Sequence, residues 1–582
     1  MWITRFKADS LSPNYQNVDL EFAPVNVFLG RNNSGKSRLL QTLLQEVSKQ
    51  TGSNDKRIDP SLASNPEIIY SEELPTPQKS QMPPFRYIPV DRTPNYTLNT
   101  QMFHTNNSPT GQGVSDILEQ LHEYPLLRPK LQFEIERLLG VSFAFEYQER
   151  SFVWHVVDNS PSPSPSPSPK VTLHQHGRGV QYYVTLFFYL YHPDIKVLFI
   201  DEPENSLHPQ LQRALIDRIR EIACKEGKQV FLSTHSPLFA LPDTVDDFKG
   251  IFLLQRYHTP PQILSLSSLV PSTSEERHRF DSFLPNFDPS ITELFFATGG
   301  LIVEGQTERY FMQYIANRTG RDFHQHEITI IESNGLGLMP SLIRVAQPIL
   351  QHWRAFCDND LLYKPGAKFE GFRKDMETTL GIPIPKKKSE DEKGLTEIRA
   401  ALKAKGLYVL PEDGLEHYFK SPTAISYFED RAESIDAKDK GWLLAEEIRF
   451  LNEQTSEFIE ITYADLVEPL DEIMTVVKKT MFKAHTMDQL VRDVLFNDAN
   501  TIHCQAYRQQ WNEELFRQFL SQTKALNAYD LKFHSFQHYE LYWKDPVGGI
   551  YRIRCEGINF FVEHENQSDG IYKGLRQGTV GV

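Results

Sequence analysis

The chain has 582 residues, and 61 Lys and Arg against 76 Asp and Glu give it a formal net charge of −15 at pH 7. This length predicts about three or four domains, and a composition with 40% hydrophobic and 24% charged residues excludes wholesale disorder and a collagen-like chain. The net negative charge argues against a general nucleic-acid coat protein, although it leaves room for an enzyme that grips DNA locally.

The sequence also carries signals about its compartment. No long apolar run predicts a membrane span, and the N-terminus lacks the features of a secretory leader. The four cysteines are scattered and form neither a CxxC pair for zinc nor a disulfide framework. We therefore expect a cytoplasmic protein without a membrane partner.

A buried strand, a glycine-rich turn and a helix are predicted in succession near the N-terminus. Residues 25–29 are apolar, residues 30–37 are Gly-Arg-Asn-Asn-Ser-Gly-Lys-Ser, and leucines follow at helical spacing. The turn fits G-x-x-x-x-G-K-[ST], in which backbone N–H groups wrap phosphates, the lysine neutralises the β and γ oxygens and the hydroxyl ligates Mg²⁺. The expected nucleotide-binding residues are Gly30, Asn33, Gly35, Lys36 and Ser37.

The next part of the chain is predicted to hold an insertion. Residues 54–81 are rich in Ser, Pro and Asn and predict a loop, residues 85–90 predict a strand, and residues 113–140 predict a helical stretch followed by two short strands. Residues 160–169 strictly alternate Ser and Pro, a pattern that favours an extended, solvated spacer. We therefore interpret residues 94–170 as an insertion in the first domain.

Two later strands end in polar side chains that suit nucleotide chemistry. Residues 196–200 predict a buried strand that delivers Asp201 and Glu202, and residues 229–233 predict another that leads to His235. Asp201 would hold Mg²⁺ through water, Glu202 would orient or deprotonate the attacking water, and His235 would contact a γ-phosphate. The loop at 204–209 could bridge two protomers. The structural alternative is a set of buried strands with incidental polar ends.

In this order the motifs resemble an ABC-type ATPase head of the SMC and RecF kind, over residues 1–93 and 171–245. In that family the signature loop of one head completes the ATP site of another. The segment 174–181, with Gly177 and Gly179, lies in the matching place, but it lacks the serine of Leu-Ser-Gly-Gly-Gln. This departure leaves nucleotide binding as the expectation and puts vigorous hydrolysis in doubt. Arg92 and Gln78 are further candidates for the site, with a solvated loop as the alternative.

A second set of carboxylates follows strands in the middle of the chain. Glu304 ends one predicted strand, Glu308 lies in the first turn of the next helix, and Asp358 and Asp360 follow another apolar strand. Carboxyl ends of parallel strands meet at one sheet edge, so these side chains should converge there. Clustered carboxylates suit one or two Mg²⁺ or Mn²⁺ ions that clamp a phosphodiester. Each piece alone has a structural alternative, namely a helix start for the glutamates and a turn for Asp-x-Asp.

Together with Gly335, these carboxylates resemble a Toprim domain, the fold shared by topoisomerases, primases and certain nucleases. An ABC head followed by a Toprim domain resembles the OLD (overcoming lysogenization defect) family of ATP-dependent nucleases. The resemblance implies cleavage or nicking of DNA with Mg²⁺ or Mn²⁺, and dimerisation through the inserted segment. It also implies one more acidic residue, for which Glu416 fits better than Asp413. The implied basic residue, which would stabilise the transition-state phosphate, fits Lys483 better than Lys478 or Lys479, with a surface lysine as the alternative.

The resulting expectation is an α/β protein whose parts are an ABC ATPase domain (1–93 and 171–290), its insertion (94–170), a Toprim nuclease domain (295–499) and a C-terminal region (500–582). The expected function is an ATP-regulated DNA endonuclease of bacterial antiphage defence or DNA maintenance. The alternatives are a nucleotide-switched structural clamp that does not cut and, with less support, a topoisomerase or primase. Expected partners are DNA and a second copy of the chain. Members of the family that this chain resembles occur alone, with a helicase or with a retron-type reverse transcriptase, and the sequence does not distinguish these three cases.

Overall fold

The computed structural model forms two compact units, residues 1–474 and 475–582. It describes residues 2–11, 15–50, 63–71, 84–88, 124–139, 141–148, 151–158, 171–172, 178–205, 207–256, 258, 261–287, 289–363, 366–384, 392–412, 414–431, 437–484, 527–535, 538–544, 550–556, 559–565 and 572–579. No helix within these ranges is long and apolar enough to cross a membrane. The expected α/β architecture is confirmed.

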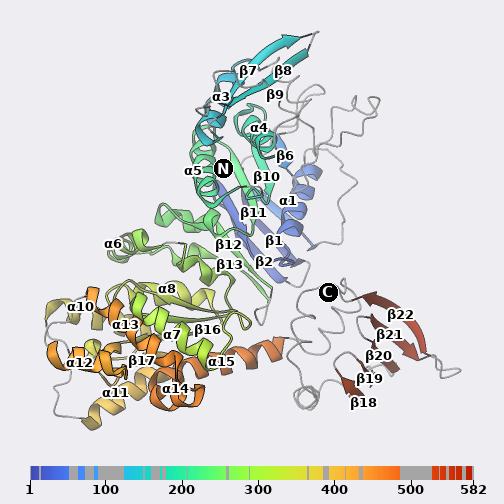
Figure 1. Cartoon of the computed structure of the whole chain (residues 1–582). Helices are drawn as coiled ribbons and strands as arrows, with labels where there is room; N and C mark the ends of the chain where they lie inside the picture. Colours follow the sequence, from blue (N-terminus) through green and yellow to red (C-terminus); the bar gives the residue numbers. More distant parts are fainter. Residues whose placement is uncertain are drawn as a thin grey trace. The chain divides into compact units, whose positions relative to one another are not determined.

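The N-terminal part of the first unit contains a six-stranded, mostly parallel sheet (Figure 1). Its strand order is β13-β12-β3-β11-β10-β6, and only β13 runs antiparallel to its neighbour. The strands are β3 (Val25–Leu29), β6 (Phe85–Ile88), β10 (Val197–Asp201), β11 (Gln229–Thr234), β12 (Ile251–Gln255) and β13 (Gln262–Ser265). The strand at 196–200 and its neighbours were predicted from their continuous apolar runs, which suit strands covered on both faces.

Both faces of this sheet are covered, because successive side chains of a strand point to opposite sides. Phe199 and Phe231 pack with the leucines of one helix, whereas Leu198 and Leu232 pack on the other face. The covering helices are α1 (Lys36–Gln50), α4 (Arg178–Tyr191) and α5 (Pro209–Lys225), and α3 (Leu127–Leu139) packs against α4 and α5. A four-stranded antiparallel sheet lies on the α1 side; its strands are β1 (Ile3–Leu11), β2 (Tyr15–Glu21), β4 (Ala63–Ser64) and β5 (Glu67–Tyr70).

The predicted insertion contains α3 and the strands β7 (Val141–Gln148) and β8 (Ser151–Asp158), and β9 (Val171–Thr172), directly after its predicted end, completes a three-stranded antiparallel sheet. The two strands expected after the helical stretch are therefore confirmed, with α3 covering the end of that stretch. The Ser-Pro segment at 160–169 lies outside the described residues. Buried Glu134 attaches α3 to the rest of the unit, because it accepts hydrogen bonds from Tyr191 and Arg218.

A second sheet, entirely parallel, begins near residue 299 with the order β15-β14-β16-β17. Its strands are β14 (Gly299–Val303), β15 (Ile328–Glu332), β16 (His352–Cys357) and β17 (Leu407–Val409). The helices around it are α7 (Gln306–Arg318), α8 (Met339–Ile349), α9 (Asp360–Tyr363), α10 (Ala367–Leu380), α11 (Glu392–Ala404), α12 (Pro422–Arg431), α13 (Ala437–Asn452), α14 (Ser456–Thr462) and α15 (Ala464–Ala484). This is the strand and helix alternation that the sequence predicted.

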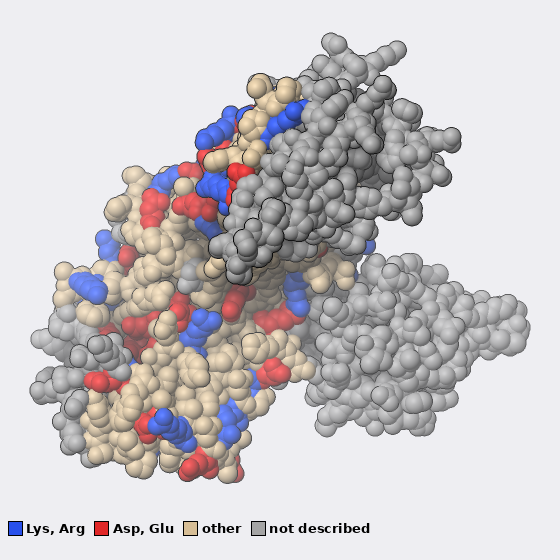
Figure 2. Space-filling model, turned by 45° about the horizontal axis from the view of Figure 1, so that its top comes forward, with Lys and Arg blue, Asp and Glu red and all other residues tan. Residues whose placement is uncertain are grey.

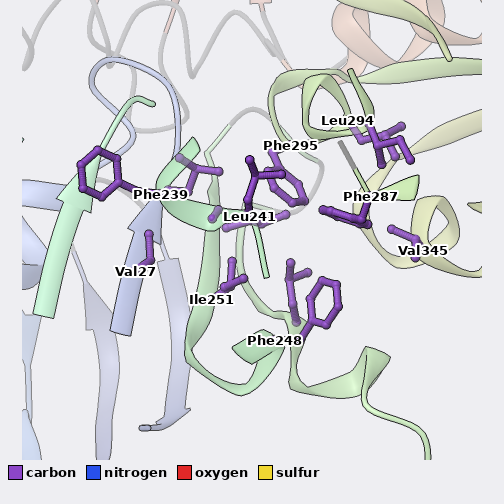
Figure 3. Close-up of a cluster of buried hydrophobic side chains, with 14 of the residues drawn as sticks. Val27, Phe239, Leu241, Phe248, Ile251, Phe287, Leu294, Phe295 and Val345 are labelled. Carbon is purple, nitrogen blue, oxygen red and sulfur yellow. The ribbon is translucent and has the colours of Figure 1, made fainter. Parts of the chain in front are cut away.

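One hydrophobic core connects the two sheets of the first unit. It extends from Val27 on β3 to Val345 on α8, and an aromatic group that includes Phe248, Phe287 and Phe295 lies between them (Figure 3). The connecting elements are η3 (Pro237–Ala240), η4 (Val245–Gly250), η5 (Leu266–Leu269), α6 (Ser274–Phe283), η6 (Leu284–Asn286) and η7 (Ile291–Phe296). Because this core is continuous, the two sheets belong to one packed body.

The second unit contains a five-stranded antiparallel meander in the order β18-β19-β20-β21-β22. Its strands are β18 (Asn527–Ser535), β19 (His538–Lys544), β20 (Ile550–Glu556), β21 (Asn559–Glu565) and β22 (Tyr572–Thr579). The neighbouring strands β19 and β20 pair antiparallel along their full length.

Candidate functional site

The glycine-rich turn between β3 and α1 has a fixed shape. Asn33 and Gly35 adopt positive φ angles of 63° and 97°, which let the chain double back before the helix begins. A Cβ added at Gly30 would lie 2.6 Å from Ser34 Oγ and 2.9 Å from Leu254 O, so a larger residue would displace the turn. The hydroxyl of Tyr15 donates to Ser34 O at 2.6 Å and braces the turn from β2.

Lys36 directs its ammonium group back into this turn. Nζ donates to Gly30 O at 2.9 Å and to Arg31 O at 3.0 Å, and it lies 3.1 Å from His235 Nδ1. Burial lowers the pKa of Lys36 to about 8, although the carboxylates of Glu202 and its neighbours oppose this shift. An anionic phosphate in the turn would restore the charged form, because an opposite charge favours ionisation.

The ends of β10 and β11 bring the predicted magnesium and water-handling residues beside the turn. Asp201 Oδ1 accepts from Ser37 Oγ at 3.1 Å, which places the two expected Mg²⁺-site residues in contact. His235 Nε2 lies 2.7 Å from Glu202 Oε1, so one carboxylate contacts the imidazole at the end of the next strand. Glu202 has a φ of 47°, an uncommon conformation for a non-glycine residue and one found at functional sites.

Three residues of this site were missed in the sequence. Ser233 Oγ and Tyr87 OH both donate to Asp201, the latter at 3.3 Å, and Glu204 Oε1 accepts from the backbone N–H of His235 at 2.6 Å. Burial and the Asp201 carboxylate raise the pKa of Tyr87, which keeps its hydroxyl a donor. No motif marks these positions, since they hold Asp201 and His235 through tertiary packing.

Only the end of the expected signature loop, residues 174–181, falls within the described residues. Gly179 lies in the first turn of α4, whereas Gly177, Gln78 and Arg92 lie outside the described residues. Their roles stay predictions. The described residues that meet at this site are Lys36, Ser37, Asp201, Glu202 and His235.

The carboxylates of the second sheet converge at its carboxyl edge. Parallel β14 and β16 lie side by side and lead directly to Glu304 and Asp358. Gly305 allows α7 to begin at once, so Glu308 turns back toward the strand end, and its carboxylate lies within 3.1 Å of a Cβ added at Gly305. Gly335 has a φ of 110° and its N–H donates to Glu304 O at 2.8 Å, which confirms the predicted turn after the second strand.

This cluster is short of positive charge. Burial, reinforced by the neighbouring carboxylates, raises the pKa of Asp358 to about 8. Burial also raises the pKa values of Glu304 and Glu308, with Glu308 and Asp360 adding to the shift at Glu304. In addition, Glu304 Oε2 and Asp358 Oδ1 are buried without a hydrogen-bond partner. A bound cation would stabilise the ionised form of such buried acceptors.

Glu416, favoured over Asp413 in the sequence, belongs to this cluster. It lies in η8 (Leu415–Tyr418), is 5% exposed and contributes to the raised pKa of Asp358. Asp413 lies outside the described residues.

Lys440 is the basic residue that the structure places among these carboxylates. Its ammonium group pairs with Glu416, and its charge opposes the raised pKa values of Asp358 and Glu308. The sequence had favoured Lys483, which lies in α15 with a side chain outside the described residues, so its role stays a prediction. Lys440 could not be chosen from sequence, because only the packing of α13 against α7 and η8 brings it here.

The donor set suits a hard divalent cation. Carboxylate oxygens are the ligands that Mg²⁺ and Mn²⁺ prefer, and two of those present lack any other donor. Among the described residues, no group of three or more His, Cys, Asp or Glu side chains has the geometry of a preformed metal site. The Lys440 ammonium already neutralises part of the cluster, in the role that a bound cation would take.

Two family models match parts of this chain. Residues 99–240 match an AAA ATPase domain, and residues 295–360 match the Toprim domain of proteins like the overcoming lysogenization defect protein. The first match contains Asp201 and Glu202, and the second contains Glu304, Glu308, Asp358 and Asp360. Both candidate sites therefore overlap a recognised domain.

Known relatives agree with these models. The chain is 28% identical over 157 residues to the OLD nuclease of Thermus scotoductus, covering 27% of this chain and 29% of that protein. It is 23% identical over 248 residues to Endonuclease GajA of Bacillus cereus, covering 39% of this chain and 35% of that protein. The structure of the C-terminal region of the Xanthomonas campestris OLD protein is 16% identical, with a TM-score of 0.25, and covers 33% of this chain and 100% of that one. The chain thus spans about a third of the length of the curated relatives it matches.

Proposed function

We propose that this chain, a member of the OLD family by its ATPase segment and its OLD-like Toprim domain, is an ATP-regulated, metal-dependent endonuclease that nicks or cleaves DNA. The observation that carries the proposal is the buried carboxylate cluster at the edge of the Toprim sheet, with its orphaned oxygens and raised pKa values. Purely structural carboxylates are expected to find donors, because an unpaired buried charge is costly.

The chain's own residues divide the work at the nuclease site. The carboxylates that would hold Mg²⁺ or Mn²⁺ are Glu304, Glu308, Asp358, Asp360 and Glu416. A bound divalent ion supplies Lewis-acid activation of water and of the phosphoryl oxygen. Lys440 holds Glu416 and places a positive charge beside the cluster, where it can stabilise the extra negative charge of the phosphate in the transition state. Lys483 remains a candidate for the same role.

The ATPase site is proposed to bind ATP with Mg²⁺ and to regulate cutting. Lys36 would exchange its bonds to Gly30 O and Arg31 O for the β and γ oxygens, while Ser37 and Asp201 would hold the ion. Glu202 would act as the base for the attacking water and His235 would contact the γ-phosphate, and the contact between the two side chains supports these roles. The alternative to a nuclease, a nucleotide-switched clamp that does not cut, would use the same ATP site. Only the Toprim site therefore distinguishes the two functions.

A plasmid-nicking assay distinguishes these alternatives most directly. Supercoiled plasmid incubated with the full chain and Mg²⁺ or Mn²⁺ should give open-circular or linear DNA, and chelation of the ion should stop the reaction. If no ion supports cutting even when a partner encoded alongside is present, the clamp is favoured. The proposed setting is antiphage defence or DNA maintenance, with a helicase or a retron-type reverse transcriptase as the class of partner.

The nucleotide turn contacts the Toprim sheet directly. Arg31, inside the turn, forms an ion pair with Glu327, and Thr298 Oγ1 donates to the same carboxylate at 3.0 Å. Thr298 immediately precedes β14, the strand that leads to Glu304. The carbonyl of Arg31 is one of the groups that Lys36 would release on binding phosphate. This contact supports a route by which nucleotide binding changes the geometry of the nuclease site.

Breaking the Arg31–Glu327 pair should therefore uncouple the two sites. In Arg31→Ala and Glu327→Gln we expect cleavage to persist. The ratio of the cleavage rates with and without ATP should become about 5-fold or more closer to one than in wild type, because allosteric couplings usually start at about this size. The measurement is the cleavage rate across an ATP series. Arg309→Ala, which removes a longer Toprim ion pair of 3.6 Å to Glu293, is the control. A wild-type ATP response in both variants would contradict this route.

We also propose that the chain is at least a dimer, with the inserted segment as a contact. Two apolar residues stand out on it: Leu126 before α3 is 81% exposed and Phe133 on α3 is 58% exposed. Burying such a side chain contributes about 1.5–3 kcal/mol, so Phe133→Glu should weaken the dimer by roughly 10-fold or more in sedimentation. Ile461→Glu, which alters a residue on α14 that is 72% exposed, should leave the dimer unchanged. A wild-type monomer at all concentrations would contradict the assembly.

A further inference from the structure

Asn359, between Asp358 and Asp360, connects two loops of the nuclease site. Its side chain is 3% exposed, and its Nδ2 donates to Pro411 O at 3.2 Å. Its Oδ1 accepts from Arg399 Nη2 at 3.1 Å, and that guanidinium nitrogen also donates to Pro411 O at 3.3 Å. Three groups from the end of β16, from α11 and from the end of β17 therefore form one closed set of hydrogen bonds.

These hydrogen bonds lie just beyond the last backbone pairing of β16 with β17. Leu410 N donates to Cys357 O at 3.0 Å, which is the last backbone bond between the two strand ends before the carboxylates. Beyond it, the loops approach closely, since a Cβ added at Gly414 would lie 3.5 Å from Asp358 Oδ2 and 2.7 Å from Glu416 Oε2. Past Leu410, the side-chain bonds of Asn359 and Arg399 to Pro411 O and to each other therefore hold the two loops at this close separation.

We propose that Asn359 and Arg399 are positioning residues for the metal-binding carboxylates, fixing the Asp358–Asp360 loop against the loop that carries Glu416. This inference rests on the proposed nuclease function. Neither side chain contributes an oxygen to the carboxylate cluster; each acts through the spacing of the groups that do. Second-layer partners of this kind typically change metal affinity or activity by about 10- to 100-fold when they are removed.

The residue types fit this role. The amide of Asn359 donates and accepts at once, whereas an aspartate would lose the bond to Pro411 O and add another negative charge to the cluster. Arg399 offers several donors on a planar group and brings a positive charge beside two acidic loops. A lysine at position 399 would retain the positive charge but would donate from one nitrogen atom and not from a planar guanidinium. It should therefore preserve part of the effect.

The test is a titration of Mn²⁺ into the full chain, with free Mn²⁺ followed by electron paramagnetic resonance. Asn359→Leu and Arg399→Ala should bind Mn²⁺ about 10- to 100-fold more weakly than wild type, and Arg399→Lys should fall between. In plasmid nicking, the Mn²⁺ concentration for half-maximal rate should rise by the same factor, with most of the rate recovered at saturating Mn²⁺. Arg344→Ala is the matched control, because it removes a bond of 3.0 Å to Thr379 between α8 and α10, outside the cluster.

The outcomes separate this inference from the proposed function. Wild-type Mn²⁺ affinity in both Asn359→Leu and Arg399→Ala would overturn it, as would an equal loss of affinity in Arg344→Ala. If wild type binds Mn²⁺ no better than Glu304→Gln, the metal site itself fails and the positioning role falls with it. Weaker binding in the two variants at an unchanged melting temperature, with partial rescue by Arg399→Lys, would support the inference.

Discussion

Replacing Lys36 by alanine should weaken ATP binding by about 100-fold or more, and it should do so without preventing cleavage by the Toprim site. Lys36 is the charged donor that the turn holds toward the phosphates, and a hydrogen bond to a charged group is worth about 1.5–3 kcal/mol. A lysine that meets two phosphate oxygens should therefore account for most of the affinity. The measurement is a direct titration with ATP and Mg²⁺ by calorimetry.

Two further variants serve as controls for ATP binding and for ATP turnover. Lys49→Ala removes the same charge from the exposed end of the same helix, where Lys49 pairs with Glu46, and it should bind ATP like wild type. Glu202→Gln keeps the phosphate turn intact and should bind ATP normally but turn it over more slowly, since Glu202, which contacts His235, is proposed to orient or deprotonate the attacking water. If Lys36→Ala binds ATP as tightly as Lys49→Ala, the nucleotide site is wrongly assigned.

The parts of both sites that lie at strand ends could be predicted from the sequence. A short apolar run followed by a carboxylate fixes the strand, and the parallel arrangement then brings the ends of separate strands to one edge. This is why Asp201 meets Ser37 and why Glu304 meets Asp358, although the members of each pair are far apart in the chain. Local pattern and topology are sufficient for these residues.

The residues that hold the carboxylates could not be predicted in this way. Lys440, Arg399 and Tyr87 reach the sites from the sides of α13, α11 and β6, so their positions depend on how those elements pack. Hydrophobic periodicity identifies the buried face of a helix but not which polar residue at its border will reach a site. The sequence-based preference for Lys483 over Lys478 or Lys479 reflects this limit, because no sequence pattern singles out Lys440 on α13.

Charge in the nuclease site also affects stability. Because burial and neighbouring carboxylates raise the pKa of Asp358 to about 8, its ionised form is disfavoured in the metal-free fold. The unfolded chain ionises near the ordinary value, so the metal-free protein should lose stability as pH rises from there to about 8. Asp358→Asn removes this titration and should leave the melting temperature at pH 8 equal to or above that of wild type. Added Mn²⁺ should stabilise wild type but not this variant.

Replacing Glu304 by alanine should abolish most DNA cleavage, lowering the rate on the order of 10³-fold or more, which corresponds to about 4 kcal/mol of transition-state stabilisation. Glu304 ends β14 at the centre of the cluster, and its orphaned Oε2 is an oxygen that a metal ion would take. Because burial and the neighbouring carboxylates raise the pKa of Glu304, its charge does not favour the metal-free fold, so ATP binding and melting temperature should be preserved. The measurement is plasmid nicking over a Mg²⁺ and Mn²⁺ series.

The control must remove a carboxylate without touching the cluster. Glu397→Ala does so on the exposed side of α11 and should cut like wild type, whereas Asp358→Ala should match the loss in Glu304→Ala. Undiminished cleavage by both Glu304→Ala and Asp358→Ala would move the chemistry away from this edge of the Toprim sheet. Cleavage that survives Lys36→Ala but not Glu304→Ala would instead assign cutting to the Toprim carboxylates and regulation to the nucleotide turn, because the two variants disable sites on different sheets.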